Sequence, residues 1–215
     1  MRLGVDEAGK GPVLGSMFAA AVRADPEALP EDIDDSKNLS PARREELAEK
    51  LHGDDRVSVG VAEIPPDRID DPETDMNTLT VAAQADALSA VAADGDAGIV
   101  DAGDTDAERF GRRVTERVSA DVDIGAEHGA DEAHAIVGAA SVIAKVARDS
   151  HVAELATAYE EYDGIGSGYP SDPTTREFLR SYVDDTGDLP SCARASWQTS
   201  RDVLAAATQS ALDEF

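Results

Sequence analysis

The first residues place two acids at the end of an apolar run and follow them with a glycine-rich turn. The stretch RLGVDEAGKGPVLGS, residues 2–16, begins as a short buried strand and carries Asp6 and Glu7 where that strand should end. A Gly-Pro turn then leads into a second apolar segment, residues 13–22, which also predicts a strand. Two strands joined so closely predict a hairpin, and the hairpin favours a mixed sheet over a fully parallel one.

Apolar patterns in the rest of the chain predict further strands and then mainly helices. Strands are expected in RVSVGVAEI, in AGIVDAG, which ends at Asp101, and within residues 118–131. Helices are expected after Ser40, a capping residue before Pro41, and over residues 76–93, 133–160, 173–185 and 197–212. We therefore predict an α/β sheet domain over residues 1–160, with a helical region over residues 161–215.

Charge is the unusual part of the composition. The chain has 45 acidic residues against 19 lysines and arginines, a net charge of -26, and the acids are spread along its whole length. This pattern is typical of proteins from salt-accumulating halophiles, because molar salt shortens the Debye length to about 3 Å and screens repulsion between surface carboxylates. The alternative is an acidic protein from a mesophile.

The single cysteine and the apolar runs indicate the compartment. One cysteine, Cys192, excludes an internal disulfide framework and fits a reducing cytosol. The N-terminus enters a strand almost at once, which argues against a signal peptide. No apolar run approaches the roughly 18 residues of a membrane span. We expect a soluble cytoplasmic protein.

Three acids lie at predicted strand ends: Asp6, Glu7 and Asp101. Neighbouring strand ends are where open sheets bind ligands. Carboxylates without histidine or cysteine form a hard-oxygen site suited to Mg²⁺ or Mn²⁺. The alternative is chance in so acidic a chain. Alternation along a strand also sends Asp6 and Glu7 to opposite faces, unless a strand end or bulge brings them together.

Two lysine-containing loops could contact phosphate. Gly9, Lys10 and Gly11 combine close backbone approach with a positive charge, although a tight turn would look the same. The spacing is not that of a P-loop. Lys37 lies in the polar loop LPEDIDDSKNLS, where an ordinary helix-entry loop is the alternative.

A polar stripe and an aromatic loop complete the candidate residues. Ser141, Lys145 and Asp149 recur every four residues, so they share one face of an otherwise apolar helix. This face is typical of a helix beside a site, and the alternative is a solvated Lys145–Asp149 pair. Tyr169 lies in the rigid loop GSGYPSDP and could stack on a base or sugar, or simply anchor the loop.

Together these segments resemble one family. GVDEAGKGPVLG, DSKNLS, IVDAGD, GAD at residues 129–131, AASVIAKVARD, GSGYPSDP and RASW occur in the family's order between residues 4 and 197. The chain is similar to ribonuclease HII, the type 2 ribonuclease H, and closest in spacing to its archaeal branch. The resemblance implies a ribonuclease H-like mixed five-stranded sheet flanked by helices, with a C-terminal helical region that helps to hold the duplex.

The resemblance also implies an activity. Family enzymes cut the RNA strand of RNA–DNA hybrids, and DNA at single embedded ribonucleotides, leaving a 5′-phosphate and a 3′-hydroxyl. By this likeness two Mn²⁺ or Mg²⁺ ions are held by four catalytic carboxylates, Asp6, Glu7, Asp101 and Asp131. Gly9, Lys10 and Gly11 match the loop that reads the 2′-hydroxyl of the ribonucleotide, and Tyr169 matches a stacking tyrosine. Substrate contacts are further expected from Lys37, Ser141 and Lys145.

Three features depart from what the family or its substrate suggests. Lys10 stands where arginine is usual, so the charge is kept but the bidentate fork is lost. Gly129 stands where a lysine is common. The net charge of -26 opposes binding to a polyanion. We hypothesise that metal ions and four cations form a local positive patch while salt screens the rest, the cations being Lys10, Lys37, Lys145 and Arg148.

The sequence also leaves open a non-catalytic role and a contact with a partner protein. A non-catalytic hybrid-binding protein of the same fold would be marked by loss of a metal carboxylate, and none of the four is lost. The family resemblance suggests a monomer. The C-terminal QSALDEF ends in an acid and an aromatic residue, which would suit a replication clamp contact, although a frayed helix end is the simpler interpretation.

Overall fold

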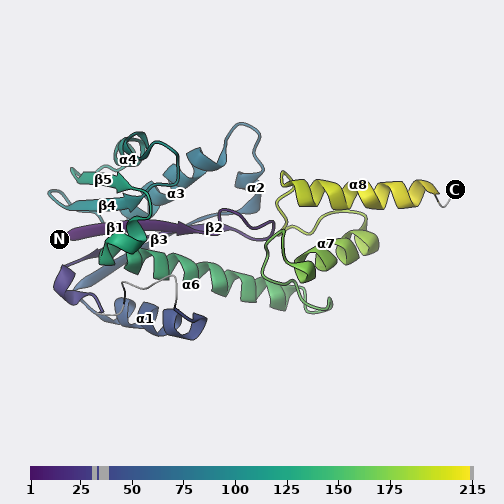
Figure 1. The fold of residues 1–215 in the computed structure, drawn as a ribbon, viewed down its shortest axis with the longest axis horizontal. Coiled ribbons are helices and arrows are strands. Elements are labelled where there is room, and N and C mark those ends of the chain that lie inside the picture. The colour runs from purple at the N-terminus through teal and green to yellow at the C-terminus, as the bar shows by residue number, and fades with distance from the viewer. Residues whose placement is uncertain (31–32, 34–38, 214–215) are drawn as a thin grey trace. The chain divides into compact units, whose positions relative to one another are not determined.

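A five-stranded sheet is built around the first strand of the chain. The strand order is β3-β2-β1-β4-β5, and β1 pairs antiparallel with β2 and parallel with β4, which in turn pairs parallel with β5. The mixed sheet predicted from the early hairpin is therefore confirmed (Figure 1). The strands span Arg2–Ala8 (β1), Met17–Ala24 (β2), Val57–Ile64 (β3), Ala97–Asp101 (β4) and Asp123–Glu127 (β5).

The computed structural model describes residues 1–30, 33 and 39–213, with the backbone alone over residues 210–213. The chain forms two units, each assembled from separate stretches of sequence. The first unit comprises Met1–Ala8, Met17–Glu63 and Asp75–Arg148, and the second comprises Gly9–Ser16, Ile64–Thr74 and Asp149–Phe215.

The second strand begins later than the sequence pattern suggested. Strand β2 starts at Met17, so residues 13–16 of the predicted strand lie outside it. Their backbone bonds are made within the second unit instead, where the Val13 amide donates to the Gly168 carbonyl at 2.8 Å. The Gly15 amide donates to the Cys192 carbonyl, also at 2.8 Å. Residues 13–16 are apolar enough to look like part of a strand, and their apolar character does not show that they pair with loop residues instead.

In the first unit helices lie on both faces of the sheet. Buried residues of α1 and α6 form one apolar cluster with Ala20, Val22 and Ala24 of β2. On the other face, the α3 residue Thr80 donates a weak hydrogen bond to Met17 of β2. The helices of this unit span Pro41–Gly53 (α1), Met76–Ser89 (α3), Ala107–Thr115 (α4) and Ala130–Ala133 (α5), together with a 3₁₀ turn, Pro26–Ala28 (η1), and most of α6, Ala135–Ala158.

Helix ends show how closely the sequence specified these elements. The Ser40 hydroxyl accepts from the Arg43 amide at 3.3 Å and caps α1, as predicted. The predicted helix over residues 76–93 ends earlier, at Ser89. Helix α4 was not predicted, although Asp106 caps it by accepting from the Arg109 amide at 2.9 Å. Its three arginines and one glutamate outnumber its apolar residues, so the segment does not stand out as apolar in the sequence.

The second unit is mainly helical. It contains α2 (Pro66–Ile69), the end of α6, α7 (Pro173–Thr186) and α8 (Gln198–Asp213). Val13, Leu14, Phe178 and Leu179 are among the buried residues of its core. Cys192 is a buried free thiol in the same core, and burial raises its pKa to about 11. This cysteine is therefore an apolar packing residue that stays protonated at neutral pH.

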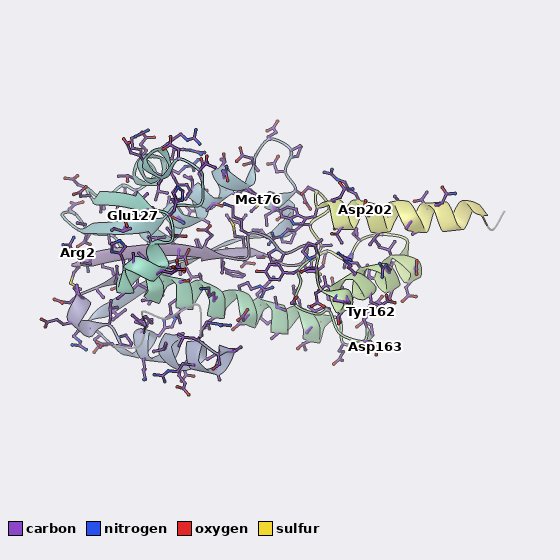
Figure 2. The ribbon with its side chains drawn as sticks, in the orientation of Figure 1. Arg2, Met76, Glu127, Tyr162, Asp163 and Asp202 are labelled. Atoms are coloured by element: carbon purple, nitrogen blue, oxygen red, sulfur yellow. The ribbon has the colours of Figure 1, made fainter. Side chains whose placement is uncertain are left out.

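Acidic side chains are exposed on elements throughout the chain. Figure 2 labels three of them, Glu127, Asp163 and Asp202, and all three are exposed to solvent. Exposed carboxylates of this kind repel one another at low salt and are screened at high salt. Among the helices that the structure describes, none combines the length and apolar character that crossing a lipid bilayer requires.

Gly4 provides a test of the packing between β1 and α6. A Cβ atom built on Gly4 would lie 2.4 Å from the carbonyl carbon of Ile136, which is backbone and cannot turn aside. We expect Gly4→Ala to lower the free energy of unfolding by about 1–3 kcal/mol, the usual cost of overpacking. Urea unfolding in molar KCl measures this difference.

Gly53→Ala is the matched control, because a Cβ atom at Gly53 would meet nothing within 4 Å. In the last turn of α1 alanine should be neutral or slightly stabilising. Equal unfolding free energies for both variants would show that β1 and α6 are not packed as closely as described.

Candidate active site

A carboxyl group is buried inside the central strand of the sheet. The side chain of Asp6 is only 5% exposed, and its Oδ1 accepts from the Glu7 amide at 2.7 Å. Burial raises the pKa of Asp6 well above its usual range. The negative charges of Glu7 and Asp101 raise this pKa further, whereas a hydrogen bond with Ser141 of α6 lowers it. The groups that shift this pKa most include no cation.

Glu7 lies on the opposite face of the same strand. The β1–β2 register runs regularly through Asp6↔Ala20 and Glu7↔Ala19, so the two acids alternate as the strand geometry predicts. No bulge brings them to the same face. Glu7 instead meets helix α3, where the Gln84 side-chain nitrogen donates to its Oε2 at 2.6 Å.

Gln84 links the two acidic strands, and sequence reasoning missed it. The same Gln84 nitrogen donates to the backbone carbonyl of Asp101 at 2.9 Å, so it joins β1 to β4. Gln84 is fully buried, and its Oε1 has no hydrogen-bond partner among the described residues. The available signal was a lone amide in the mainly apolar segment of residues 79–88, whose other polar residues are Thr80 and Asp86. A buried amide oxygen is a hard donor, of the type that suits a divalent cation.

Asp101 and Asp131 lie near the start of α5. The Ala130 amide donates to Asp101 Oδ1 at 2.7 Å. Asp131 is in the first turn of α5 and only 5% exposed. Gly129 precedes this helix with a φ of 67°, a left-handed conformation that favours glycine over lysine. The backbone therefore accounts for one departure from the family pattern.

The polar stripe on α6 reaches the buried acid. Lys145 Nζ donates to Ser141 Oγ at 2.8 Å, and Ser141 in turn bonds with Asp6. Ser141 is fully buried while Lys145 is partly exposed. A contact of this kind with Asp6 is expected of a helix beside the predicted site. Lys145 is thus linked to Asp6 through the Ser141 hydroxyl.

The donor set fits a divalent cation in its chemistry. It consists of carboxylate, amide and hydroxyl oxygens, and a bound cation would compensate the buried charge of Asp6. Among the described residues no three acid, histidine or cysteine side chains are already arranged to hold a metal ion. Alternation along β1 separates two of the four acids, because Asp6 and Glu7 leave the strand on opposite faces.

The second unit carries the predicted phosphate loop and the aromatic residue. Gly9 has a φ of 87° at the start of the Gly9–Gly11 loop. A Cβ atom at Gly11 would lie 3.7 Å from Cε1 of Tyr169, so this loop and the tyrosine are neighbours. Tyr169 is 41% exposed, which suits stacking better than anchoring in a core. The predicted contact Lys37 lies outside the described residues.

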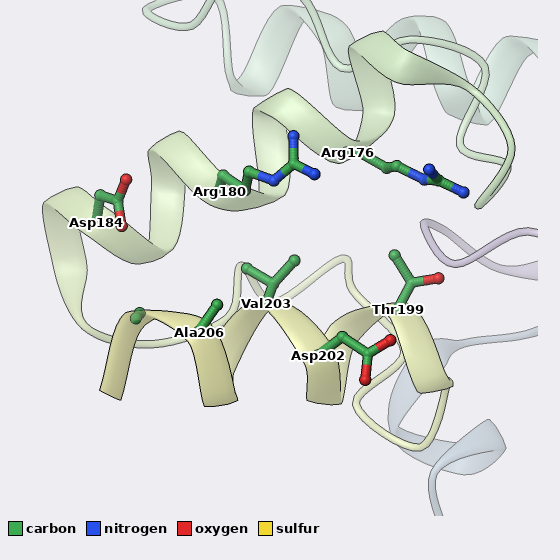
Figure 3. A pocket seen from close by; sticks show the side chains of 8 residues that line it. Arg176, Arg180, Asp184, Thr199, Asp202, Val203 and Ala206 are labelled. Carbon is green, nitrogen blue, oxygen red and sulfur yellow. The ribbon is translucent and has the colours of Figure 1, made fainter. Parts of the chain in front are cut away.

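A groove runs between α7 and α8 of the same unit. Figure 3 shows Arg176 and Arg180 on α7, with Thr199, Asp202 and Val203 on α8 across from them. Its volume is about 480 Å³. The Arg176 guanidinium donates to the Pro170 carbonyl, and Arg180 pairs with Glu177 at 3.3 Å. The groove thus carries both signs of charge and includes none of the predicted site residues.

Comparison with known proteins identifies the family. The family model for ribonuclease HII matches residues 3–200. The chain belongs to the ribonuclease HII family. It is 68% identical to ribonuclease HII of Halobacterium salinarum (strain R1) over 214 residues, covering 100% of this chain and 99% of that protein. The protein is therefore a hydrolase of the ribonuclease H type, an endoribonuclease acting on RNA–DNA hybrids.

Solved ribonuclease HII structures confirm the predicted fold class. Ribonuclease H2 of Pyrococcus horikoshii superposes with a TM-score of 0.88 at 35% identity, covering 97% of this chain and 99% of that one. The enzyme in the PCNA:RNase HII complex of Archaeoglobus fulgidus gives a TM-score of 0.79 at 36% identity, with coverage of 92% and 95%. The mixed five-stranded sheet with flanking helices is that of ribonuclease HII.

The buried acid predicts an unusual dependence of stability on pH. Because the pKa of Asp6 is raised in the folded protein, the folded state binds this proton more tightly than the unfolded state does. Stability should therefore fall as pH rises from the unfolded pKa through the folded one. In EDTA at pH 7, Asp6→Asn should be more stable than wild type by on the order of 1–3 kcal/mol.

Urea unfolding in molar KCl from pH 4 to pH 8 tests this expectation. The advantage of Asp6→Asn should shrink toward pH 4, because the wild-type carboxyl in the folded protein takes up its proton as the pH falls. Asp163→Asn, a change at an exposed acid, should show no such trend. A pH-independent difference for Asp6→Asn would contradict the described burial.

Proposed function

We propose that this ribonuclease HII cuts the RNA strand of RNA–DNA hybrids and also cuts DNA at single embedded ribonucleotides, leaving a 5′-phosphate and a 3′-hydroxyl. One observation carries the proposal: Asp6 is buried beside Glu7 and Asp101 with no cation among the groups that most shift its pKa. A chain that keeps such a charge inside its central strand loses stability, so the charge needs a functional reason.

We propose that Asp6, Glu7, Asp101 and Asp131 hold two divalent ions, Mg²⁺ or Mn²⁺. Ions bound there would activate a water molecule and stabilise the leaving 3′-oxygen. The carboxylates are oriented by their own partners. Ser141 and the Glu7 amide hold Asp6, while the Ala130 amide holds Asp101.

Gln84 would hold the Glu7 carboxylate of the same site in position. Its nitrogen binds the Glu7 carboxylate and the Asp101 carbonyl, which fixes the spacing of the two strands at the acids. Partners of this kind typically change metal affinity about 10–100-fold when removed. Lys145, through its hydrogen bond to Ser141, would help to orient that hydroxyl toward Asp6.

Substrate recognition is proposed for the loop and tyrosine of the second unit. Backbone amides of Gly9, Lys10 and Gly11 would contact the 2′-hydroxyl and phosphate of the ribonucleotide, and Tyr169 would stack on the nucleotide beside it. Lys10 supplies a point charge without the fork of an arginine, so it adds attraction but little direction. Lys37 remains a predicted contact.

High salt would make this acidic chain compatible with a nucleic-acid substrate. A net charge of -26 repels a polyanion at low salt, whereas molar salt reduces that repulsion to a range of about 3 Å. Local cations such as Lys10, Lys145 and Arg148 then act only on phosphates that they touch. The similarity to the protein from Halobacterium salinarum supports a halophilic setting.

Replacing Asp101 tests the catalytic proposal. We expect wild type, in molar KCl with Mn²⁺ or Mg²⁺, to cut on the 5′ side of a single ribonucleotide in a DNA duplex. Asp101→Asn should lower kcat by more than about a hundredfold, because a metal ligand supports several kcal/mol of transition-state stabilisation. Asp163→Asn, far along the chain and exposed, should cut at the wild-type rate.

The products and the binding of uncut duplex separate the outcomes. End-labelling should find a 5′-phosphate and a 3′-hydroxyl. Cleavage by Asp101→Asn at the wild-type rate would remove this carboxylate from the proposed site. A folded wild type that binds the duplex without cutting it would favour a non-catalytic hybrid-binding role.

We also propose a sliding-clamp contact at the C-terminus. The support is the PCNA complex of the Archaeoglobus fulgidus enzyme, together with the acid and aromatic residue that end this chain. A chain lacking residues 209–215 should no longer co-elute with a haloarchaeal clamp in size-exclusion chromatography in molar KCl. It should still cut a free duplex, and unchanged co-elution would contradict the contact.

A further inference from the structure

Three successive carbonyl groups of the Gly9–Gly11 loop are bound by one segment far along the chain. Arg194 Nη2 donates to the Gly9 carbonyl at 2.6 Å, and its Nη1 donates to the Lys10 carbonyl at 3.0 Å. Trp197 Nε1 donates to the Gly11 carbonyl at 3.2 Å. All of these residues belong to the second unit. We call Arg194 and Trp197 the loop clamp.

Arg194 is unusual among the charged residues because it is fully buried, with an exposed fraction of 0%. Its Nε donates to the Gly15 carbonyl at 2.9 Å, and its backbone amide donates to the Val13 carbonyl at 2.8 Å. Its guanidinium carbon lies 4.9 Å from the centre of the Trp197 ring. A buried guanidinium is costly unless its donors are matched, and here three of them meet backbone carbonyls.

The clamp determines which way the loop amides point. In a trans peptide the carbonyl and the following N–H point in opposite directions, and the described chain has no cis peptide. Carbonyls of Gly9 and Lys10 that point toward Arg194 therefore send the amides of Lys10 and Gly11 away from it. The Gly11 carbonyl is followed by Pro12, which has no N–H to direct.

The clamp is itself anchored from behind. Asp70, at the end of α2, accepts from the Ala195 amide at 2.7 Å and from the Ser196 amide at 2.9 Å. The Ser196 hydroxyl also donates to this carboxylate. The residues between Arg194 and Trp197 are thus hydrogen-bonded to the end of a helix. This holds the backbone that carries the two clamp side chains in place.

We propose that Arg194, assisted by Trp197, is a positioning residue that presents the Lys10 and Gly11 amides to the ribonucleotide. This inference rests on the proposed function of the loop and adds the group that shapes it. Its buried positive charge also lies directly beneath the loop, where salt screens it less than an exposed lysine. In a chain of net charge -26 that would work in molar salt, a buried cation continues to attract phosphate.

Two conservative variants test the clamp. Arg194→Lys keeps the charge but loses the fork, and Trp197→Phe keeps the ring but loses the N–H donor. For a duplex with one ribonucleotide we expect KM to rise about tenfold in each, the effect of one or two lost hydrogen bonds, with a smaller change in kcat. Arg68→Lys, at an exposed arginine of α2, should behave as wild type.

Binding without cleavage gives a readout that a merely structural role would not move. In Ca²⁺, we expect both clamp variants to lose about tenfold in preference for a ribonucleotide over a deoxyribonucleotide, while affinity for all-DNA duplex is unchanged. The ¹⁵N-amide signals of Lys10 and Gly11 should shift in both variants. For Arg194→Gln, which also loses the charge, the added loss of affinity should persist from 1 M to 3 M KCl.

Several outcomes would overturn the proposal. Wild-type discrimination and KM in both conservative variants, with unshifted loop amides, would show that the clamp does not position the loop. Loss of native signals throughout the protein would show that Arg194 supports the fold and not the loop. If wild type itself neither cuts nor prefers ribonucleotides, the proposed function fails, and the amide shifts still report on the clamp.

Discussion

The buried carboxyl group of Asp6 is the constraint on which the first unit depends. Strand β1 pairs with β2 along its whole length and with β4 as far as Val5, so the backbone that carries Asp6 and Glu7 is held within the sheet. The helices on the two faces must therefore supply polar groups at otherwise apolar positions. Helix α6 supplies Ser141 against Asp6, and α3 supplies Gln84 against Glu7. The positions of the acids thus determine where each helix carries a buried polar residue in place of an apolar one.

The second unit uses a buried charge of the opposite sign. Arg194 is as inaccessible as any core residue, yet its guanidinium is bound by the backbone carbonyls of Gly9, Lys10 and Gly15. Exposed charges contribute little in molar salt, because screening reduces them to contact range. A buried charge such as that of Arg194 is screened much less, so it keeps more of its electrostatic effect at high salt.

Much of this could be predicted from local sequence. The hairpin, the capped start of α1 at Ser40 and the strand ending at Asp101 are local patterns, and the structure has them. Alternation also correctly placed Asp6 and Glu7 on opposite faces. Helix α4 and the true start of β2 at Met17 were missed. The charged residues of α4 concealed its apolar periodicity. Residues 13–16 looked like strand, but their backbone groups pair with distant loop residues.

The sequence by itself determined the family and the succession of strands along the chain, and it predicted four candidate metal-binding acids, because these depend on residue type and short spacing. Only the tertiary structure showed that Gln84 joins β1 to β4 and that Arg194 holds the Gly9–Gly11 loop. These contacts join residues that are between 17 and 185 positions apart. No local pattern encodes such a pairing, because it depends on how the folded backbone brings distant segments together.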